Sequence, residues 1–147
     1  DLHPEYRRQR QMCIRDRSQM KRLKEIVDRR TALAARYDKL LANLPVQRPI
    51  QAPSTGSSWH LYVIQVPQNH HSQIFDYLKR AGIGVNIHYI PIHRHPYYRS
   101  MGFKLGQFPN AESYYSKSIS IPLYFGLTEK DQDQVCATLE QCFLRIT

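Results

Sequence analysis

The chain has 147 residues, of which 41% are hydrophobic and 22% are charged, and this is typical of one globular domain with a single core. No apolar run is long enough to cross a bilayer, and residues 1–17 lack the apolar stretch of a secretion signal, so the sequence predicts a cytoplasmic protein. Cys13, Cys136 and Cys142 form no closely spaced pair, which argues against a disulfide framework and against a cysteine-based zinc site.

The formal net charge of +9 is concentrated near the beginning of the chain. Residues 1–36 carry 11 basic and 5 acidic side chains, whereas residues 37–147 carry 10 basic and 7 acidic ones. A basic segment can attract nucleic acid or another anionic partner. It is also the composition of a solvated helix face, so a nucleic-acid-binding module using the basic N-terminus stays an alternative hypothesis.

Residues 1–17 differ in pattern from the rest of the chain. They contain five arginines with almost no apolar periodicity, and Met12–Arg17 is similar to translated sequencing-adapter sequence. We therefore expect the native domain to cover residues 18–147, with residues 1–17 foreign to it.

The first predicted element is a helix over residues 18–43. Apolar side chains recur along it at spacings of three, four and seven, which places them on one face, opposite the lysines and arginines. They are Met20, Leu23, Val27, Ala34, Tyr37 and Leu41. Pro45 and Pro49 end this helix and begin a surface connection rich in Pro, Ser and Gln.

Two predicted strands flank the next predicted helix. Residues 60–66 (HLYVIQV) and 83–90 (IGVNIHYI) are apolar runs rich in β-branched and aromatic residues. Between them, residues 71–81 predict a helix that Gly82 ends. His71, at the start of this helix, is expected to face solvent.

The last third of the chain predicts two more helices around one short strand. The helices cover residues 109–117 and 129–145, and the strand covers residues 118–123. Thr128, with Asp131 three residues later, forms a weak capping box for the last helix. Because short strands alternate with helices, the sequence predicts an α/β (α+β) fold in which helices pack on a small, mostly antiparallel sheet.

The densest group of polar and aromatic residues is Asn86–Tyr98 (NIHYIPIHRHPYY), which runs from a predicted strand into a Pro-rich loop. Three interpretations of this segment remain open. His88, His93 and His95 could form a metal-binding site, although no carboxylate or cysteine accompanies them. The side chains could pack the loop, or they could form the wall of a site for a nucleotide or a phosphorylated sugar.

Four blocks of the sequence together resemble the C-terminal region of the DegT/DnrJ/EryC1/StrS sugar aminotransferases. They are SQMKRLKEIVDRRTALAARYDKLL (18–41), HLYVIQV (60–66), LKRAGIGVNIHYIPIHRHPYYR (78–99) and FPNAESYYSKSISIPLYFGLTEKDQDQV (108–135). The likeness extends from about Ser18 to Phe143. Within the family it is strongest to the transaminases that make UDP-4-amino-4,6-dideoxy-N-acetyl-β-L-altrosamine for pseudaminic acid synthesis.

This resemblance implies the small C-terminal domain of a fold-type-I enzyme that uses pyridoxal phosphate, with residues 18–43 as the helix linking the small and large domains. It implies that an amino group passes from glutamate to a keto nucleotide-sugar of the UDP-4-keto-6-deoxy-HexNAc type, within a homodimer. His88, Tyr89 and His93 match the family's loop near the nucleotide-sugar site, so we expect them to contact substrate. Tyr98 is a further candidate for substrate contact. Neither nucleic acid nor a membrane is an expected partner.

The resemblance also implies that the cofactor site lies on other polypeptide. None of the lysines matches the family's Schiff-base lysine motif; they are Lys21, Lys24, Lys39, Lys79, Lys104, Lys117 and Lys130. We therefore assign no catalytic residue, no cofactor-binding residue and no metal ligand within this chain. The chain alone is expected to be inactive.

Overall fold

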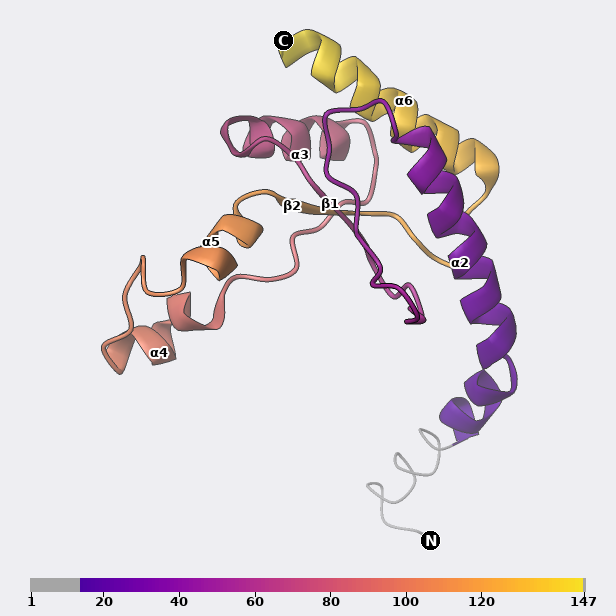
Figure 1. Ribbon diagram of the computed structural model, residues 1–147, viewed down its shortest axis with the longest axis horizontal. Helices are drawn as coiled ribbons and strands as arrows, with labels where there is room; N and C mark the ends of the chain where they lie inside the picture. Colours follow the sequence, from indigo (N-terminus) through magenta and orange to yellow (C-terminus); the bar gives the residue numbers. More distant parts are fainter. Residues whose placement is uncertain (1–13, 147) are drawn as a thin grey trace, which may run out of the picture.

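The structure is a computed structural model that describes residues 14–146, in which helices surround a small sheet (Figure 1). Residues 1–13 and 147, including most of the segment expected to be foreign, lie outside the described residues. The helices are α2 (Leu23–Leu40), α3 (His71–Arg80), α4 (Pro96–Ser100), α5 (Pro109–Tyr115) and α6 (Glu129–Ile146). The other elements are strands β1 (Tyr62–Gln65) and β2 (Ser118–Ile121) and the 3-10 helices η1 (Gln68–His70) and η2 (Ile92–Arg94).

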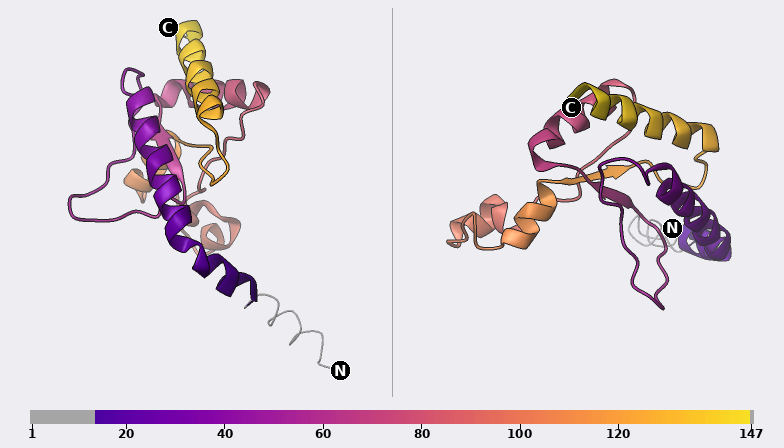
Figure 2. Two further views of the ribbon diagram at one scale, coloured as in Figure 1. Left: turned by 90° about the vertical axis from the view of Figure 1, so that its right-hand side faces the viewer. Right: turned by 45° about the horizontal axis from the view of Figure 1, so that its top comes forward.

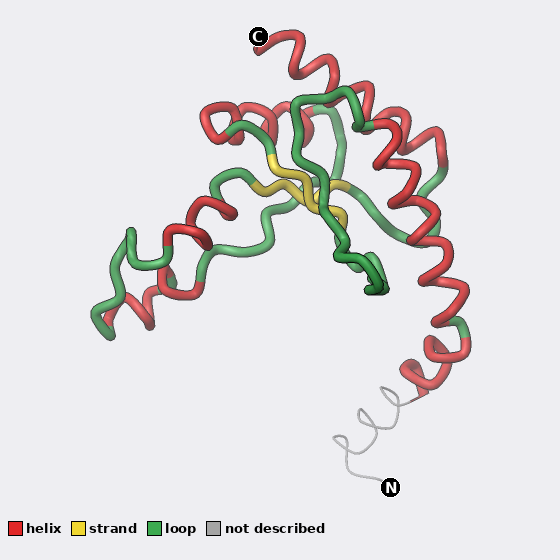
Figure 3. The backbone as a smooth tube through the Cα atoms, in the orientation of Figure 1, coloured by secondary structure: helices red, strands yellow, loops and turns green. Residues whose placement is uncertain are grey.

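The sheet consists of two antiparallel strands that cross the middle of the molecule (Figure 3). Tyr62 lies opposite Ile121 and Ile64 lies opposite Ile119, so apolar side chains from both strands form cross-strand pairs. Tyr62, Ile64 and Ile119 are fully buried. The predicted fold class, helices packed on a small antiparallel sheet, is confirmed.

The prediction of a strand over residues 83–90 is wrong. Only Asn86 joins the sheet, through an isolated antiparallel bridge to Ser120. Both backbone hydrogen bonds of this bridge are present, at 3.2 and 2.8 Å between nitrogen and oxygen. The next hydrogen-bonded pair in the same register would place Gly84 opposite Pro122, and Pro122 has no backbone N–H to donate. The ladder therefore cannot extend in that direction.

A side chain occupies the position where the ladder would extend in the other direction. The register of the bridge places His88 opposite Ser118. The carbonyl oxygen of Ser118 instead accepts a hydrogen bond from Nε2 of His71, at 3.1 Å. The prediction that His71 faces solvent is therefore wrong, and the chain after Asn86 is free to leave the sheet.

Two buried tyrosines hold α2 against the sheet. The rings of Tyr37 and Tyr62 lie 5.1 Å apart between centroids. The Tyr37 hydroxyl donates to the carbonyl oxygen of Pro122 at 3.0 Å, and the Tyr62 hydroxyl donates to Oδ1 of Asp38 at 2.6 Å. Because each buried phenol has an acceptor, burial of these rings leaves no unpaired hydroxyl. Burial raises the pKa of both tyrosines.

The helix predicted over residues 18–43 is interrupted. Residues 14–21 are helical, Arg22 adopts a non-helical conformation, and α2 then runs to Leu40. The apolar face is buried only in the second half, since Met20 is 65% exposed and Leu23 is 46% exposed. The N-terminal part of this helical segment thus extends beyond the core, as Figure 2 shows.

Helix α6 begins at the predicted capping box and packs against α3 and α2 (Figure 2). The Thr128 hydroxyl accepts the backbone N–H of Asp131 at 3.1 Å, and Oδ2 of Asp131 accepts the backbone N–H of Thr128 at 3.0 Å. Val135, Leu139 and Phe143 are buried, as the four-residue spacing predicted. The capping box and the last helix are therefore confirmed.

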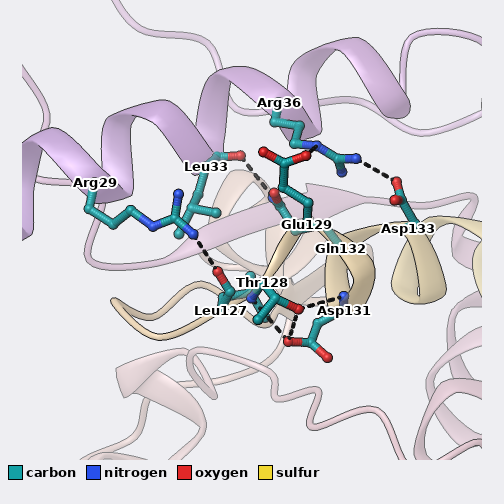
Figure 4. Close-up of polar contacts among 9 residues, drawn as sticks. All are labelled: Arg29, Leu33, Arg36, Leu127, Thr128, Glu129, Asp131, Gln132 and Asp133. Carbon is teal, nitrogen blue, oxygen red and sulfur yellow. Dashed lines mark hydrogen bonds and ion pairs between the residues drawn. The ribbon is translucent and has the colours of Figure 1, made fainter.

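Two arginines of the basic segment, residues 1–36, contribute to the contact between α2 and the start of α6 (Figure 4). Arg29 Nη2 donates to the carbonyl oxygen of Leu127 at 2.8 Å. Arg36 forms ion pairs with Asp133 at 2.7 Å and with Glu129 at 3.8 Å. These arginines contribute to the packing of the domain, which reduces the charge that α2 offers to an anionic partner.

The segment from η2 to α5 projects away from the helices around the sheet (Figures 1 and 2). We call residues 91–115 the arm. The arm contains η2, α4 and α5, and it begins where the chain has left the sheet after Asn86. None of the described helices is long and apolar enough to span a membrane.

Candidate functional site

His88 lies where the chain leaves the sheet, and both of its ring nitrogens have partners. Nδ2 of Asn86 lies 3.2 Å from Nε2, and Oγ of Ser120 lies 2.8 Å from Nδ1. Because an amide nitrogen can only donate, Nε2 accepts, and Nδ1 carries the proton donated to Ser120. This network fixes the imidazole against the sheet. Tyr89 beside it is 74% exposed and meets the ring edge-on, at 4.6 Å between centroids.

His93 lies in η2 and is buried, with 7% of its surface exposed. Its Nε2 donates to Oε1 of Glu112 at 2.8 Å, and the same oxygen accepts the backbone N–H of Gly106 at 2.8 Å. The Gly106 N–H first, and then His93, hold the pKa of the Glu112 carboxyl below its usual range. The ionised carboxylate therefore ties η2 to the loop between α4 and α5.

Gly106 belongs to a loop whose course depends on two glycines. Gly102 has φ +95° and Gly106 has φ +88°, a region that other residues rarely adopt. Between them the chain presents Phe103, Lys104 and Leu105. The glycines and the carboxylate of Glu112 together determine where these three side chains lie.

An aromatic pocket of about 440 Å³ opens beside His93 in the arm. Its lining is almost entirely apolar and comprises Pro91, Ile92, His93, Tyr98, Phe103, Phe108 and Ala111. The aromatic rings form a connected wall, since His93 lies 4.9 Å from Phe108, and Phe103 lies 6.2 Å from both Phe108 and Tyr98, between ring centroids. Such a wall suits a flat or apolar group that binds by stacking and dispersion.

A cationic pocket of about 400 Å³ adjoins the aromatic pocket. His93 and Phe103 line both pockets. The remaining lining of the cationic pocket is Ile90, Arg94, Arg99, Lys104, Leu105 and Tyr115. Three cationic side chains and no carboxylate therefore face this space.

The structure brings together two of the four residues expected to contact substrate. His93 and Tyr98 line the aromatic pocket. His88 is hydrogen-bonded to Ser120 at the sheet, and Tyr89 projects into solvent beside it. Substrate contact by all four stays a prediction.

Sequence reasoning missed much of the lining of both pockets. The missed residues are Arg94, Arg99, Phe103, Lys104, Phe108, Glu112 and Tyr115. In this region the sequence shows a segment with two glycines and two phenylalanines between two short helices. Such a pattern does not predict which side chains come into contact. The pairing of Glu112 with His93 spans 19 residues and has no local sequence signature.

His88, His93 and His95 do not assemble as a metal site. His93 pairs with Glu112, His88 contacts Asn86 and Ser120, and Nε2 of His95 donates to the carbonyl oxygen of Ile90 at 3.2 Å. Within residues 14–146, no group of three or more His, Cys, Asp or Glu side chains lies close enough to hold a metal ion. The geometry of the described residues thus gives no support to the metal-binding alternative.

The described lysines do not fit a Schiff base with pyridoxal phosphate. Such a lysine needs an enclosed amine whose charge is disfavoured by burial or by a neighbouring cation. None of the seven lysines is buried. Lys104 faces a pocket, but that pocket contains no carboxylate to pair with a pyridine nitrogen. The described residues therefore do not form a cofactor site.

Comparison of the sequence with known proteins identifies the family of this chain. The sequence model of the DegT/DnrJ/EryC1/StrS aminotransferase family matches residues 11–140. The chain belongs to this family. The chain is similar to the spore coat polysaccharide biosynthesis protein SpsC of Bacillus subtilis (strain 168), to which it is 37% identical over 124 residues. This match covers 80% of the chain and 32% of SpsC.

Solved structures of the family share the fold. Spr1654 from Streptococcus pneumoniae, assigned as a sugar aminotransferase, gives a TM-score of 0.82 at 26% identity, over 88% of this chain and 33% of that one. Helicobacter pylori PseC, an aminotransferase of pseudaminic acid biosynthesis, gives a TM-score of 0.79 at 25% identity, over 87% of this chain and 35% of that one. The chain thus spans about a third of the length of these family members.

Proposed function

We propose that this chain is the C-terminal domain of a pyridoxal-phosphate-dependent sugar aminotransferase, and that its arm binds the sugar substrate. The observation that carries the proposal is the aromatic pocket beside His93 in a chain of this family. The relative Spr1654 supports the choice of cofactor, because that protein is known in forms with PLP and with PMP. The fold that this chain shares with Spr1654 supports the same domain arrangement in the intact protein.

The roles of this chain lie on the substrate side of the reaction. Pyridoxal phosphate, held by polypeptide outside this chain, supplies the electron sink for amino transfer. Tyr98 and Phe103, each 37% exposed, offer apolar ring surface to the sugar or to the base, and a substrate in the pocket would remove that surface from water. His93 keeps its orientation through Glu112 and forms the wall between the two pockets. In this account the chain alone is inactive, because none of its lysines forms the Schiff base with the cofactor.

The finer assignment is amino transfer from glutamate to a UDP-4-keto-6-deoxy-HexNAc sugar by a cytoplasmic homodimer. The similarity to PseC supports this sugar class, and the likeness in sequence to the pseudaminic acid transaminases agrees with it. In such a dimer a second arm would lie close to each substrate site, and the ring of Tyr89, 74% exposed in the single chain, is available for contact with a partner. The hydrogen bond between His88 and Ser120, at 2.8 Å, fixes the chain next to Tyr89.

The test is amino transfer by the complete protein that contains this chain. The protein is purified with added pyridoxal phosphate, and 2-oxoglutarate and the aminated sugar are measured with glutamate and a UDP-4-keto-6-deoxy-HexNAc sugar. Equal amounts of the two products are expected. A complete protein that takes up no pyridoxal phosphate, or that transfers no amino group to any keto nucleotide-sugar, contradicts the proposal.

A further inference from the structure

A pocket of about 410 Å³ lies at the start of α6, outside the arm. It is formed by the turn after α3, the loop after β2 and the first two turns of α6, and we call it the α6 pocket. Helix α5 of the arm precedes β2, whereas the loop that lines this pocket follows β2 and leads to α6 beside α2 (Figure 1). The volume falls in the range of small-molecule sites, roughly 300–1,000 Å³.

The buried side chains that line the α6 pocket are all apolar. They are Ile83, Leu127 and Val135. Tyr124 also lines the pocket and is 51% exposed, so its ring retains surface for contact with a ligand. Because removal of apolar surface from water is favourable, this lining suits a ligand that carries a hydrocarbon stem or ring.

Asp131 supplies the only charge in the lining of the α6 pocket. Its Oδ2 accepts the hydroxyl and the backbone N–H of Thr128, at 2.6 and 3.0 Å, whereas no described residue donates to Oδ1 (Figure 4). The Thr128 hydroxyl first, and then its N–H, hold the pKa of the Asp131 carboxyl below its usual range. Within residues 14–146, Asp131 takes part in no ion pair. One oxygen of an ionised carboxylate is therefore available to a cation.

A backbone carbonyl at the same pocket also lacks a donor. Gly84 and Pro122 both line the α6 pocket. The register of the bridge between Asn86 and Ser120 pairs them, but Pro122 has no N–H to offer to the Gly84 carbonyl oxygen. In the described part of the chain, no other backbone N–H donates to that oxygen. The pocket thus presents two unpaired acceptors, and such acceptors favour a ligand that donates hydrogen bonds.

The lining favours a cationic ligand over an anionic or a neutral one. An anion would be repelled by Asp131, and a plain hydrocarbon would leave the Asp131 and Gly84 oxygens without donors. An ammonium group carries a positive charge and three N–H donors, and it can lie against the face of a tyrosine ring such as that of Tyr124. We infer that the α6 pocket binds a small organic amine, a primary ammonium group on a hydrocarbon stem or ring, with Asp131 as its counter-ion.

A ligand in the α6 pocket contacts the loop to which α2 is attached. The carbonyl oxygen of Leu127 accepts a hydrogen bond from Arg29 at 2.8 Å. The guanidinium carbon of Arg22 lies 5.2 Å from the ring centroid of Phe125 in the same loop. A bound amine therefore stabilises the loop together with its contacts to α2, and this gives the test a second readout in thermal unfolding.

The experiment is calorimetric titration of the complete protein that contains this chain. The protein is first reduced with borohydride, so that no carbonyl of bound pyridoxal phosphate can react with an amine. The probes are 2-phenylethylamine, 2-phenylethanol, which has the same ring and stem without the charge, and N-acetyl-lysine N-methylamide. The last probe represents a lysine side chain of another protein, because that side chain carries the same ammonium group.

Two variants and one control locate the binding site. Asp131→Asn removes the charge and retains an oxygen for Thr128, and Tyr124→Leu removes the ring at an exposed position. The matched control is Asp133→Asn, because Asp133 is an exposed carboxylate of α6 that pairs with Arg36 and does not line the α6 pocket.

We expect one site per chain, with 2-phenylethylamine binding about tenfold more tightly than 2-phenylethanol and more tightly than the lysine probe. Asp131→Asn weakens binding of the amine by about tenfold and leaves the alcohol unchanged, and Tyr124→Leu weakens the amine about threefold. Asp133→Asn binds as the unaltered protein does. Saturating amine raises the thermal unfolding midpoint of the unaltered protein but not that of Asp131→Asn.

The inference is overturned by a folded protein that binds amine and alcohol equally, or that binds neither. Equal weakening of amine binding in Asp131→Asn and Asp133→Asn also overturns it. If Asp131→Asn does not fold, an unchanged affinity for the amine in Tyr124→Leu overturns it instead. Tighter binding of the lysine probe than of 2-phenylethylamine overturns the choice of a small free amine. None of these results depends on amino transfer, so they leave the proposed function to its own test.

Discussion

Glu112 is the residue on which the geometry of the arm depends most, because one of its oxygens accepts two hydrogen bonds. Replacing Glu112 with Ala removes the acceptor of both His93 and the Gly106 N–H, and we expect the thermal unfolding midpoint to fall. Glu112→Gln retains an amide oxygen as acceptor and lowers the midpoint less. Thermal unfolding followed by circular dichroism measures both. An equal midpoint for the Ala variant and the unaltered chain contradicts this role.

The same carboxyl predicts a pH dependence in acid. Its pKa is lowered in the folded chain, so the unfolded chain binds the proton first as pH falls. The stabilisation is present above the ordinary pKa, about 4.5, and is lost as pH falls through the lower folded value. We expect the midpoint to decline more steeply below about pH 4.5 in the unaltered chain than in Glu112→Gln. Glu140→Gln, at an exposed position of α6, is the control and follows the unaltered chain.

Cys136 predicts a second pH dependence, in alkali. Burial raises the pKa of its thiol to about 11, so between its usual value of 9.0 and that value the unfolded chain loses the proton and the folded chain keeps it. Stability therefore falls as pH rises over this range, by about 2 kcal/mol near pH 10.5. Urea unfolding at pH 8 and pH 10.5 measures the loss, which is smaller in Cys136→Ala. The same loss in both proteins contradicts the assignment to Cys136.

Individual site residues could be predicted only where the sequence groups them. His93 and Tyr98 lie in one dense segment, and both line the aromatic pocket. Phe103 and Phe108 come from a loop whose course depends on Glu112, and the sequence contains no local sign of that contact. Side chains that meet through a long-range hydrogen bond cannot be identified from spacing alone, which is why the cationic pocket was not predicted.

At the scale of elements, the capping box of α6 offers a direct measurement. Thr128→Ala removes the hydroxyl that accepts the Asp131 N–H, and we expect it to lower the free energy of unfolding by about 1 kcal/mol. Thr128→Ser retains the hydroxyl and should cost a few tenths of a kcal/mol. Urea unfolding at neutral pH compares the three proteins. Equal losses for Ala and Ser would show that the hydroxyl does not stabilise the helix.

The helices were more predictable than the sheet. Apolar periodicity and stop residues located α3, α5 and α6 to within a few residues, because these signals are local. The segment 83–90 has the composition of a strand and yet forms only one bridge. Its pairing depends on what faces it, namely Pro122 and the carbonyl oxygen of Ser118 that His71 occupies. The composition of a segment indicates whether its side chains suit a buried strand. Whether a ladder forms depends on the backbone groups that the neighbouring strand offers.

At the scale of the whole molecule, apolar surface remains uncovered on the helical segment before the core. Ile14, Met20 and Leu23 are 61%, 65% and 46% exposed. We expect the isolated chain to bind a hydrophobic dye there, and the double substitution Met20→Ser with Leu23→Ser to reduce the dye fluorescence. Leu144→Ser, at a 77% exposed position of α6, is the control with a smaller effect. A larger effect of the control would place the exposed apolar surface elsewhere.

The arm and the helices around the sheet have separate roles in this account. Helices α2, α3 and α6 bury the core, while the arm lies outside it and presents both pockets. If the arm binds the substrate, a variant of the arm would change substrate binding with little change in overall stability. The Glu112 variants are the exception, because they disturb the arm itself.

The most direct measurement is the KM for the keto nucleotide-sugar in the complete protein, compared between the unaltered form and Tyr98→Ala. Tyr98 lines the aromatic pocket, and its ring meets that of Phe103 edge to face at 6.2 Å between centroids. Loss of that ring should raise the KM for the sugar by about tenfold, while the KM for glutamate stays unchanged. An unchanged KM for the sugar, or an equal rise for both substrates, would contradict the claim that the arm binds the sugar nucleotide.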